Sequence, residues 1–448
     1  MANIRSDAAI VSSVLRICDP GTKSCLTWFK IYWTTIDPSY SGYLITALII
    51  VSYFGLDVVV KQLLAADDVN VNSKDGNGRT ALWWSARNGR EVVVKQLLAV
   101  DGVDVTSKDD NSRTALWWAA RSGHEAVVKQ LLVVDGVNVN FKDGNGRTAL
   151  WWAARNGHEV VVKQLLAVDG VDVNSKDDVY GQTALSCATM NRHEAVVKQL
   201  LAVDGVDVTS KDGNSRTALW WAARSGHEAV VKQLLVVDGV NVNSKDGNSR
   251  TALWWAARSG HEVVVKQLLA VDGVDVNSKD DVYGRTALSW AAVNRHEAVV
   301  KQLLAVDGVD VNSKDGNGWT ALSWAAVNGH KAVVKQLLAV DGVDVNSKDG
   351  NGWTALSWAA ENGHEAVVKQ LLAVDGVDVN SKNNEYGQTA LLWAARNGHE
   401  AVVKQLLAVD GVDVNSKDDR GQTALSWAAE NRHEAVVELL QPHSNLSL

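Results

Sequence analysis

Several residue types are scarce in this chain of 448 residues, which has 3 cysteines, 3 prolines, 3 phenylalanines and 2 methionines. The cysteines (Cys18, Cys25 and Cys187) are too few for a disulfide framework, and none belongs to a Cys/His cluster of the kind that binds zinc. We therefore expect a reducing compartment, the cytoplasm or alternatively the nucleus.

An excess of positive charge and long apolar runs are also missing. The chain has 44 Lys and Arg but 52 Asp and Glu, and the resulting net charge of -8 argues against a protein that coats nucleic acid. The N-terminal stretch lacks the unbroken apolar region of a secretory signal. The most apolar window, Tyr43–Leu56, is shorter than the roughly 20 residues that span a bilayer. We expect neither a signal peptide nor a membrane span, while 46% hydrophobic residues exclude wholesale disorder.

Tryptophan, in contrast, is in excess, with 19 Trp against 7 Tyr, and a repeat explains the excess. The tripeptide Thr-Ala-Leu occurs once in each of twelve repeats, numbered 1 to 12 here, and begins at Thr46, Thr80, Thr114, Thr148, Thr183, Thr217, Thr251, Thr286, Thr320, Thr354, Thr389 and Thr423. From Thr80 the steps are 34, 34 and 35 residues and then recur, so that a block of three repeats has a period of 103 residues. Such periods indicate stacked supersecondary units, here multiplied by tandem duplication.

Each unit predicts two short helices, as in Lys142–Ser175. Thr148 is a good N-cap for the first helix, and Gly157 permits the left-handed turn that ends it. The second helix is predicted to begin at about Glu159, where apolar residues recur on one face. Because a unit this short cannot bury its own apolar face, its stability must come from neighbouring units.

This pattern resembles the ankyrin repeat. The family motif maps onto Asp143, Gly146, Thr148, Leu150, Ala153, Ala154, Gly157, His158, Val161, Val162, Leu165, Leu166, Asp172, Val173 and Asn174. The family's motif Pro is always Ala here, and its motif His is Trp, Ser, Leu or Ile. The resemblance implies an all-α ankyrin-repeat α-solenoid of about twelve helix–turn–helix repeats with short β-hairpin-like loops. The array would occupy residues 38–441, between a leader (1–37) and a C-terminal tail (442–448).

The leader is expected to be helical, and its aromatic-rich part (Ser24–Pro38) would cover the unusually apolar repeat 1. It resembles the segment that precedes ankyrin arrays in fungal NACHT- or NB-ARC-type nucleotide-switch proteins. That likeness implies a ligand-sensing array of such a receptor, or a fragment of one, as an alternative function.

A ladder of histidines, one in each of the repeats 3 to 12, does not predict a zinc site. Nine of the ten are followed by Glu, but the second His that a zinc-protease helix needs is Val, as at Val128. We expect a structural His at the turn between the two helices. The Gly-rich turns also lack the Lys and Ser/Thr of a phosphate loop. We predict no catalytic residues, cofactor, metal or small-molecule substrate, and no enzymatic activity.

Tryptophan and arginine follow a joint pattern in five repeats. A tryptophan at the motif-His position, here called the first tryptophan, is Trp83, Trp117, Trp151, Trp220 or Trp254. Four residues later comes a helix arginine: Arg87, Arg121, Arg155, Arg224 or Arg258. The spacing puts both side chains on one helix face, where the guanidinium can stack on the indole. The residue before Thr is a turn arginine: Arg79, Arg113, Arg147, Arg216 or Arg250. Later repeats have Trp319 and Trp353 there, and five repeats carry Ser instead of the first tryptophan.

The family resemblance implies that these positions line a concave groove that binds partner proteins. We therefore predict a protein-binding scaffold or recognition module whose partner has an extended acidic segment, with the arginines above, Trp319 and Trp353 as contact residues. In the opposing interpretation, duplication merely copied a neutral surface pair. Nucleic-acid binding through the arginines is disfavoured by the net charge. The second tryptophan of each repeat, such as Trp84, is expected to serve packing.

Overall fold

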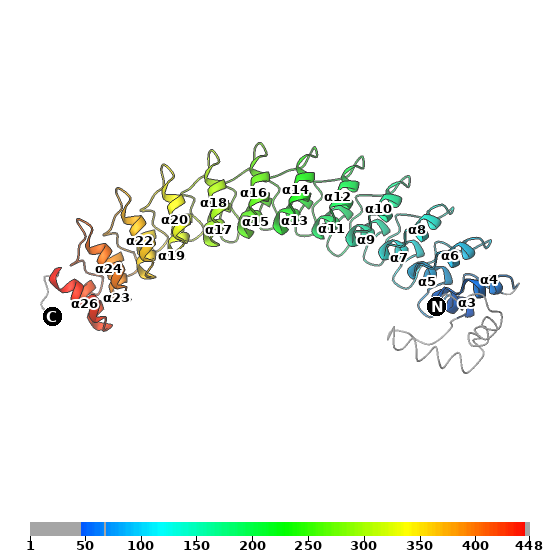
Figure 1. Ribbon diagram of the computed structural model, residues 1–448, viewed down its shortest axis with the longest axis horizontal. Coiled ribbons are helices and arrows are strands. Elements are labelled where there is room, and N and C mark those ends of the chain that lie inside the picture. The colour runs from blue at the N-terminus through cyan, green and yellow to red at the C-terminus, as the bar shows by residue number, and fades with distance from the viewer. Residues whose placement is uncertain (1–45, 67–68, 444–448) are drawn as a thin grey trace. The chain divides into compact units, whose positions relative to one another are not determined.

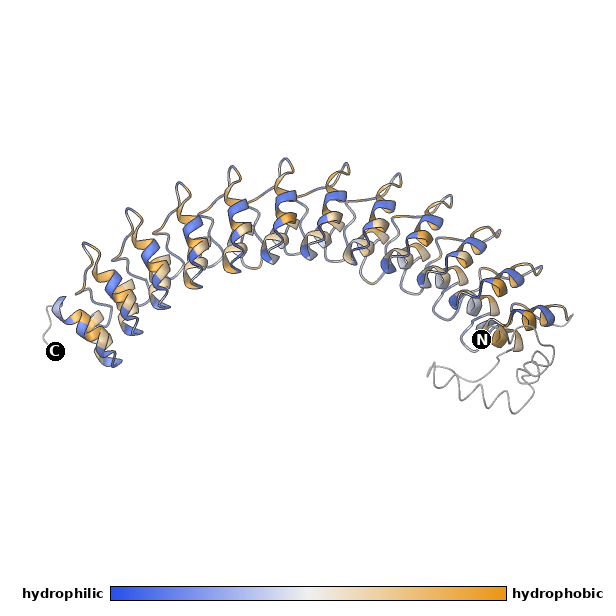
Figure 2. Ribbon diagram, viewed as in Figure 1, coloured by the Kyte–Doolittle hydropathy of each residue, from blue (hydrophilic) through white to orange (hydrophobic). Residues whose placement is uncertain are grey.

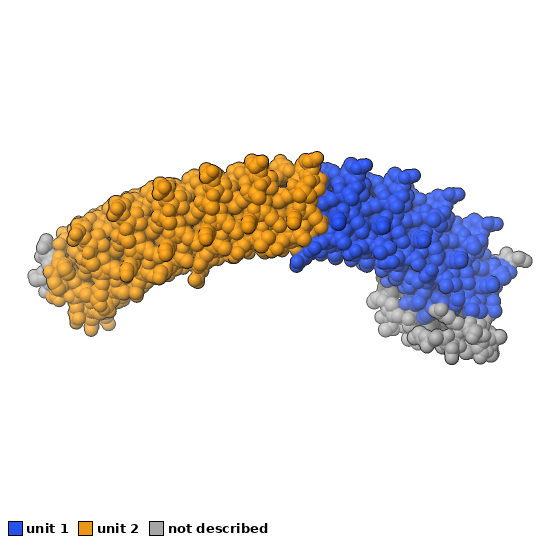
Figure 3. Space-filling view, turned by 45° about the horizontal axis from the view of Figure 1, so that its top comes forward, with its two compact units in different colours: residues 1–218 blue, residues 219–448 orange. Residues whose placement is uncertain are grey.

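The structure, a computed structural model, describes residues 46–66 and 69–443. The chain divides into two compact units, residues 1–218 and 219–448, which are described separately (Figure 3). The predicted leader and its cover over repeat 1 lie outside the described residues. Within the described part, no helix is long and apolar enough to cross a membrane.

The described residues form helix pairs joined by turns, one pair for each repeat, and contain no strand (Figure 1). The first helices are α3 (Ala47–Phe54), α5 (Ala81–Arg87), α7 (Ala115–Ser122), α9 (Ala149–Asn156), α11 (Ala184–Met190), α13 (Ala218–Ser225), α15 (Ala252–Ser259), α17 (Ala287–Val293), α19 (Ala321–Val327), α21 (Ala355–Glu361), α23 (Ala390–Arg396) and α25 (Ala424–Glu430). The second helices are α4 (Asp57–Leu64), α6 (Glu91–Leu98), α8 (Glu125–Leu132), α10 (Glu159–Leu166), α12 (Glu194–Leu201), α14 (Glu228–Leu235), α16 (Glu262–Leu269), α18 (Glu297–Leu304), α20 (Lys331–Leu338), α22 (Glu365–Leu372), α24 (Glu400–Leu407) and α26 (Glu434–Leu440), followed by a 3-10 turn, η1 (Gln441–His443). The all-α, helix–turn–helix prediction is confirmed.

The first helices begin and end where the sequence predicts. The hydroxyl oxygen of Thr148 accepts the backbone N–H of Trp151 at 3.2 Å, which satisfies one orphan donor of the first turn. Gly157 ends α9 in the left-handed conformation, with φ 75°. Three repeats place an arginine in this conformation instead: Arg192, Arg295 and Arg432.

The core of each unit lies between neighbouring helix pairs. Within unit 1, α5 packs between α3 and α7, and α6 between α4 and α8. Leu150 of α9 is 1% exposed, and Val161, Val162 and Leu165 of α10 are fully buried. The second helices contain both hydrophobic and hydrophilic residues (Figure 2), and their lysines, such as Lys163, are exposed while the paired valines are buried. Stability therefore comes from contacts between repeats, as the short helices require.

Asparagine side chains join the loops of successive repeats. The Asn140 side chain donates to the Gly170 carbonyl at 2.7 Å and accepts the backbone N–H of Asp172 at 2.8 Å. The same two bonds recur from the equivalent asparagines of several repeats, such as Asn312. Repeat 2 has Thr106 at this position, and its hydroxyl bonds within its own loop instead.

Candidate partner-binding face

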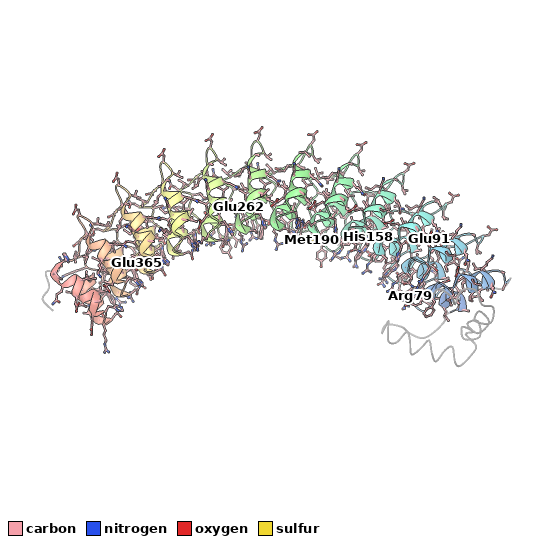
Figure 4. The ribbon with its side chains drawn as sticks, in the orientation of Figure 1. Arg79, Glu91, His158, Met190, Glu262 and Glu365 are labelled. Carbon is pink, nitrogen blue, oxygen red and sulfur yellow. The ribbon has the colours of Figure 1, made fainter. Side chains whose placement is uncertain are left out.

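The predicted site residues lie in the turns before the first helices and near the ends of those helices. Figure 4 labels Arg79 and Met190 at these two positions, and Glu91 and Glu262 at the starts of second helices. We call the side of each unit that carries these turns and the ends of the first helices the first-helix face.

The turn arginines are largely neutralised within their own repeats. Nε of Arg79 donates a hydrogen bond to the carboxylate of Asp75, four residues earlier, at 2.8 Å. Nε of Arg113 donates to the carboxylate of Asp109 at the same distance. Asp212 pairs with Arg216 in the same way. Arg79 is only 5% exposed, so the expectation of an accessible side chain is corrected: it bonds a buried carboxylate.

Two turn arginines are arranged differently. The guanidinium carbons of Arg147 and Arg250 lie 4.9 and 5.1 Å from the ring centroids of Trp151 and Trp254. Within the described part of the chain, their Nε atoms are buried without a hydrogen-bond partner. These two side chains therefore bring positive charge to the face.

The first tryptophans are interior residues rather than a surface backing. They are 1–3% exposed: Trp83, Trp117, Trp151, Trp220 and Trp254. The indole N–H of Trp151 donates to the Gln182 carbonyl of the next repeat at 3.0 Å. The ring of Trp117 meets that of Trp152, also in the next repeat, edge to face at 5.3 Å. The ring that covers Trp117 therefore belongs to a residue 35 positions later in the sequence, and the i,i+4 spacing within one helix does not reveal it.

The helix arginines stack on these indoles as predicted. The guanidinium carbon lies 5.3–5.5 Å from the ring of the first tryptophan in all five repeats: Arg87, Arg121, Arg155, Arg224 and Arg258. Most of these arginines also reach the second tryptophan of the next repeat, and there the approach is closer. Arg87 lies 4.6 Å from Trp118, and Arg121 lies 4.5 Å from Trp152. A guanidinium between two indoles loses much of its freedom to move, while its in-plane N–H groups remain available.

Positive charge accumulates around Arg121. Burial lowers the pKa of its guanidinium, and repulsion by Arg113 and Arg155 lowers it further. Arginine stays protonated nevertheless. The carboxylate of Asp143 opposes this repulsion at Arg121, but neither Arg121 nor Arg155 has a carboxylate in ion-pair contact among the described residues.

The histidine ladder is structural. Nε2 of His158 lies 3.0 Å from the carbonyl oxygen of Arg121, in the preceding repeat, and Nε2 of His193 lies at the same distance from that of Arg155. Each ring thereby fixes the backbone of the helix arginine before it. Among the residues that the structure describes, no group of three or more His, Cys, Asp or Glu could hold a metal ion.

The comparison with known families decides what this array is. A family model described as ankyrin repeats in three copies matches residues 48–143, 127–212, 169–246, 219–315, 288–383 and 368–447. The chain belongs to the ankyrin repeat family. Ankyrin repeats are generally protein–protein interaction modules and form a non-catalytic interaction fold. No curated protein matches the sequence.

In the later ankyrin repeats of unit 2, tryptophan rings replace the guanidinium groups. The ring of Trp319 stacks on that of Trp324, with 4.4 Å between the ring centroids, and its centroid lies 4.6 Å from that of Trp358 in the next repeat. Trp353 likewise lies 4.1 Å from Trp358 and 4.6 Å from Trp393. Trp353 is 4% exposed, so it has little surface for a partner, contrary to the sequence-based expectation.

These contacts explain why the first tryptophan and the helix arginine occur together. In the ankyrin repeats with Ser at the motif position, the small side chain leaves room for the turn residue to cross to the next repeat. Arg285, for example, lies 4.0 Å from Trp324 and bonds Asp315 at 3.1 Å. Where a first tryptophan fills that room, the helix arginine covers the next indole instead.

Sequence reasoning missed two members of this arrangement, Arg285 and Arg396. Arg396 follows Leu392 rather than a tryptophan, yet it lies 4.6 Å from Trp427 of the last repeat. What recurs from repeat to repeat is therefore a side chain that stacks on the second tryptophan of the next repeat, and this side chain need not follow a first tryptophan. A comparison between adjacent repeats, rather than within one, would have revealed both arginines.

Proposed function

We propose that this ankyrin array binds a partner protein along the first-helix face of unit 1, through the helix arginines Arg121 and Arg155. The observation that carries the proposal is the balance of charge on this face. Asp75 and Asp109 neutralise the turn arginines of their repeats, whereas Arg121 and Arg155 have no ion pair in the part of the chain that the structure describes.

The geometry favours carboxylates as the groups recognised. Stacking uses the flat faces of the guanidinium, so its N–H groups point along the plane, in the fork that matches a carboxylate. Packed helices lie about 8–10 Å apart, and an extended chain advances about 3.3 Å per residue. An extended segment with an acidic residue at about every third position would therefore meet successive helix arginines.

The first test measures binding of the full chain to a labelled twelve-residue peptide with Glu at every third position, by fluorescence anisotropy. A peptide with Gln in place of Glu is the ligand control. We expect the double variant R121E/R155E to weaken binding of the Glu peptide at least tenfold, because two charge-assisted contacts become repulsive. Binding should also weaken as salt is added.

A matched control has the same charge change on the other side of the same repeats. Lys129 of α8 and Lys163 of α10 are exposed on the second-helix side. The variant K129E/K163E should bind the Glu peptide nearly as well as the unaltered chain. Equal losses in both double variants would show that only net charge matters and would contradict a localised site.

Two alternative roles, nucleic-acid binding and a sensor array in a nucleotide-switch receptor, can be distinguished from the proposed function by further experiments. Tighter binding to a single-stranded oligonucleotide than to the Glu peptide, with the same arginine dependence, would favour nucleic acid. The proposal of a sensor array in a nucleotide-switch receptor concerns the leader, outside the described residues. A nucleotide-binding domain encoded next to this chain would support it. We propose a cytoplasmic location, which microscopy of the tagged chain would test.

A further inference from the structure

One helix arginine of unit 1 lacks the cover that the others have. Arg155 lies 5.3 Å from Trp151 and 5.7 Å from Trp152, both in its own repeat. The next repeat has Cys187 where the second tryptophan would be. No aromatic ring of repeat 5 lies over Arg155 within the described structure, so one face of its guanidinium has no aromatic cover.

Five equivalent steps show what normally occupies this position. A second tryptophan of the next repeat lies 4.5–5.0 Å from the guanidinium carbon of Arg87, Arg121, Arg224, Arg258 and Arg396. The counterparts of Cys187 in the two later blocks of three repeats are Trp290 and Trp393. The cysteine is thus the departure from the pattern, and the array itself shows that an indole suits this face.

The surroundings in repeat 5 do not replace the ring. Cys187 is fully buried, and its thiol lies 3.6 Å from Oε1 of Gln182, which is 5% exposed. The turn of the same repeat presents Val179 and Tyr180, which are 52% and 53% exposed. In repeat 8 the ring of Tyr283, the counterpart of Tyr180, lies 5.9 Å from Trp290, the counterpart of Cys187, and tyrosine is a residue type that often dominates binding at interfaces.

We infer that the step between repeats 4 and 5 is an aromatic subsite of the partner-binding face, in which an aromatic side chain of the partner segment stacks on Arg155 and contacts Val179 and Tyr180. The partner is accordingly an acidic segment that contains a Trp, Tyr or Phe. This inference rests on the proposed function, because the acidic residues bring the segment to the face. The aromatic residue then sets its register, since Arg155 is the helix arginine of unit 1 whose next repeat supplies no indole.

The experiment compares two labelled peptides on the full chain: the twelve-residue Glu peptide with a central Trp, and the same peptide with Ala at that position. We expect the Trp peptide to bind about 3- to 30-fold more tightly, the range of a cation–π contact from exposed to largely desolvated. The ratio of the two dissociation constants reports on the subsite alone. The Glu peptide against its Gln control reports on the proposed function, so the two can fail separately.

Variants at the subsite assign the preference. C187W should supply the missing indole and bring the ratio close to one. Repeat 12 shows that the fold accepts this combination, because it has Gln422, Ser426 and Trp427 at the positions of Gln182, Ser186 and Cys187, and Arg396 stacks on Trp427. C187A, which removes the thiol without adding a ring, should keep the preference for Trp.

R155A tests the same idea without adding bulk to the core, and it should also bring the ratio close to one. Circular dichroism would verify that each variant is folded. Equal affinity of the unaltered chain for the two peptides would overturn the inference, as would a Trp preference that survives both C187W and R155A.

Discussion

Repeat 9 offers a direct test of how neighbouring repeats are coupled. Ser323 is 2% exposed, and its small side chain leaves room for Trp319 to reach Trp358 at 4.6 Å. Replacing Ser323 by Trp should place an indole in that room. The triple variant W319R/S323W/V327R should restore a compatible set, because it gives repeat 9 the residues of repeat 4, namely Arg147, Trp151 and Arg155.

The cost of S323W has two parts. Overpacking a well-filled core costs about 1–3 kcal/mol. Displacing the Trp319 ring from Trp358 removes a stacked aromatic pair, which contributes about 0.5–1.5 kcal/mol. The local free energy of opening should therefore fall by about 1.5–4.5 kcal/mol, and the triple variant should recover most of this loss.

Hydrogen exchange followed by mass spectrometry is the suitable assay, since unfolding of a long repeat array is not a single two-state transition. Amides of α19 and α21 should exchange about 10- to 2,000-fold faster in S323W than in the unaltered chain. V327R alone is the control and should change protection little. If the triple variant exchanges as fast as S323W, the coupling between the first tryptophan and the helix arginine is refuted.

Three further substitutions and one titration test other parts of the fold. R295G should stabilise repeat 8 by about 0.5–1 kcal/mol, because Arg295 has φ 60° and glycine relieves more strain than its chain entropy costs; slower exchange of its turn would show this. T106N should add the two bonds that asparagine makes elsewhere and raise local stability by about 1 kcal/mol, seen as added protection in the loop of repeat 3. K331E should stabilise α20 by about 0.3–1 kcal/mol, since this second helix starts with a lysine, and no change in the protection of α20 would contradict the helix-dipole argument. Burial raises the pKa of Asp418, but hydrogen bonds, first among them that from Trp427 at 2.8 Å, outweigh burial and lower its pKa overall. Its stabilising contribution should therefore be full above the unfolded pKa of about 3.9 and be lost as the pH falls through the lower folded value. A D418N variant whose α25 loses protection below pH 4 as steeply as the unaltered chain would contradict this.

The helix pairs could be predicted from the sequence because their signals are local. The threonine cap, the glycine that ends the first helix and the paired valines all act within one repeat, as Thr148, Gly157 and Val161 show. Twelve copies of the Thr-Ala-Leu motif at a regular spacing made the register unambiguous. The stacking of Arg155 on Trp151 was also predictable, because it depends only on helical spacing.

Burial of the site residues could not be predicted in the same way. Trp151 is hidden because residues of the next repeat close over it, and Arg79 is hidden because Asp75 binds it. Neither helical spacing nor composition says which neighbour covers a side chain. The predicted contact set includes Trp353, which packs against Trp393 and is nearly buried, whereas the partner contacts of the helix arginines stay a prediction.

Identical segments of this chain make different contacts with the repeats that follow them. Residues 111–140 and 214–243 are the same, yet the indole N–H of Trp117 donates to the Arg147 carbonyl, whereas that of Trp220 donates to the Asp246 carboxylate. In a stack where each repeat touches only adjacent ones, a substitution changes one step of the array and leaves the remainder intact. Duplication can thus copy a binding surface, and a single change such as tryptophan to Cys187 can then make one step different. We therefore expect the recognition element of this ankyrin array to be the step between two repeats, and we expect specificity to map to steps such as that between repeats 4 and 5.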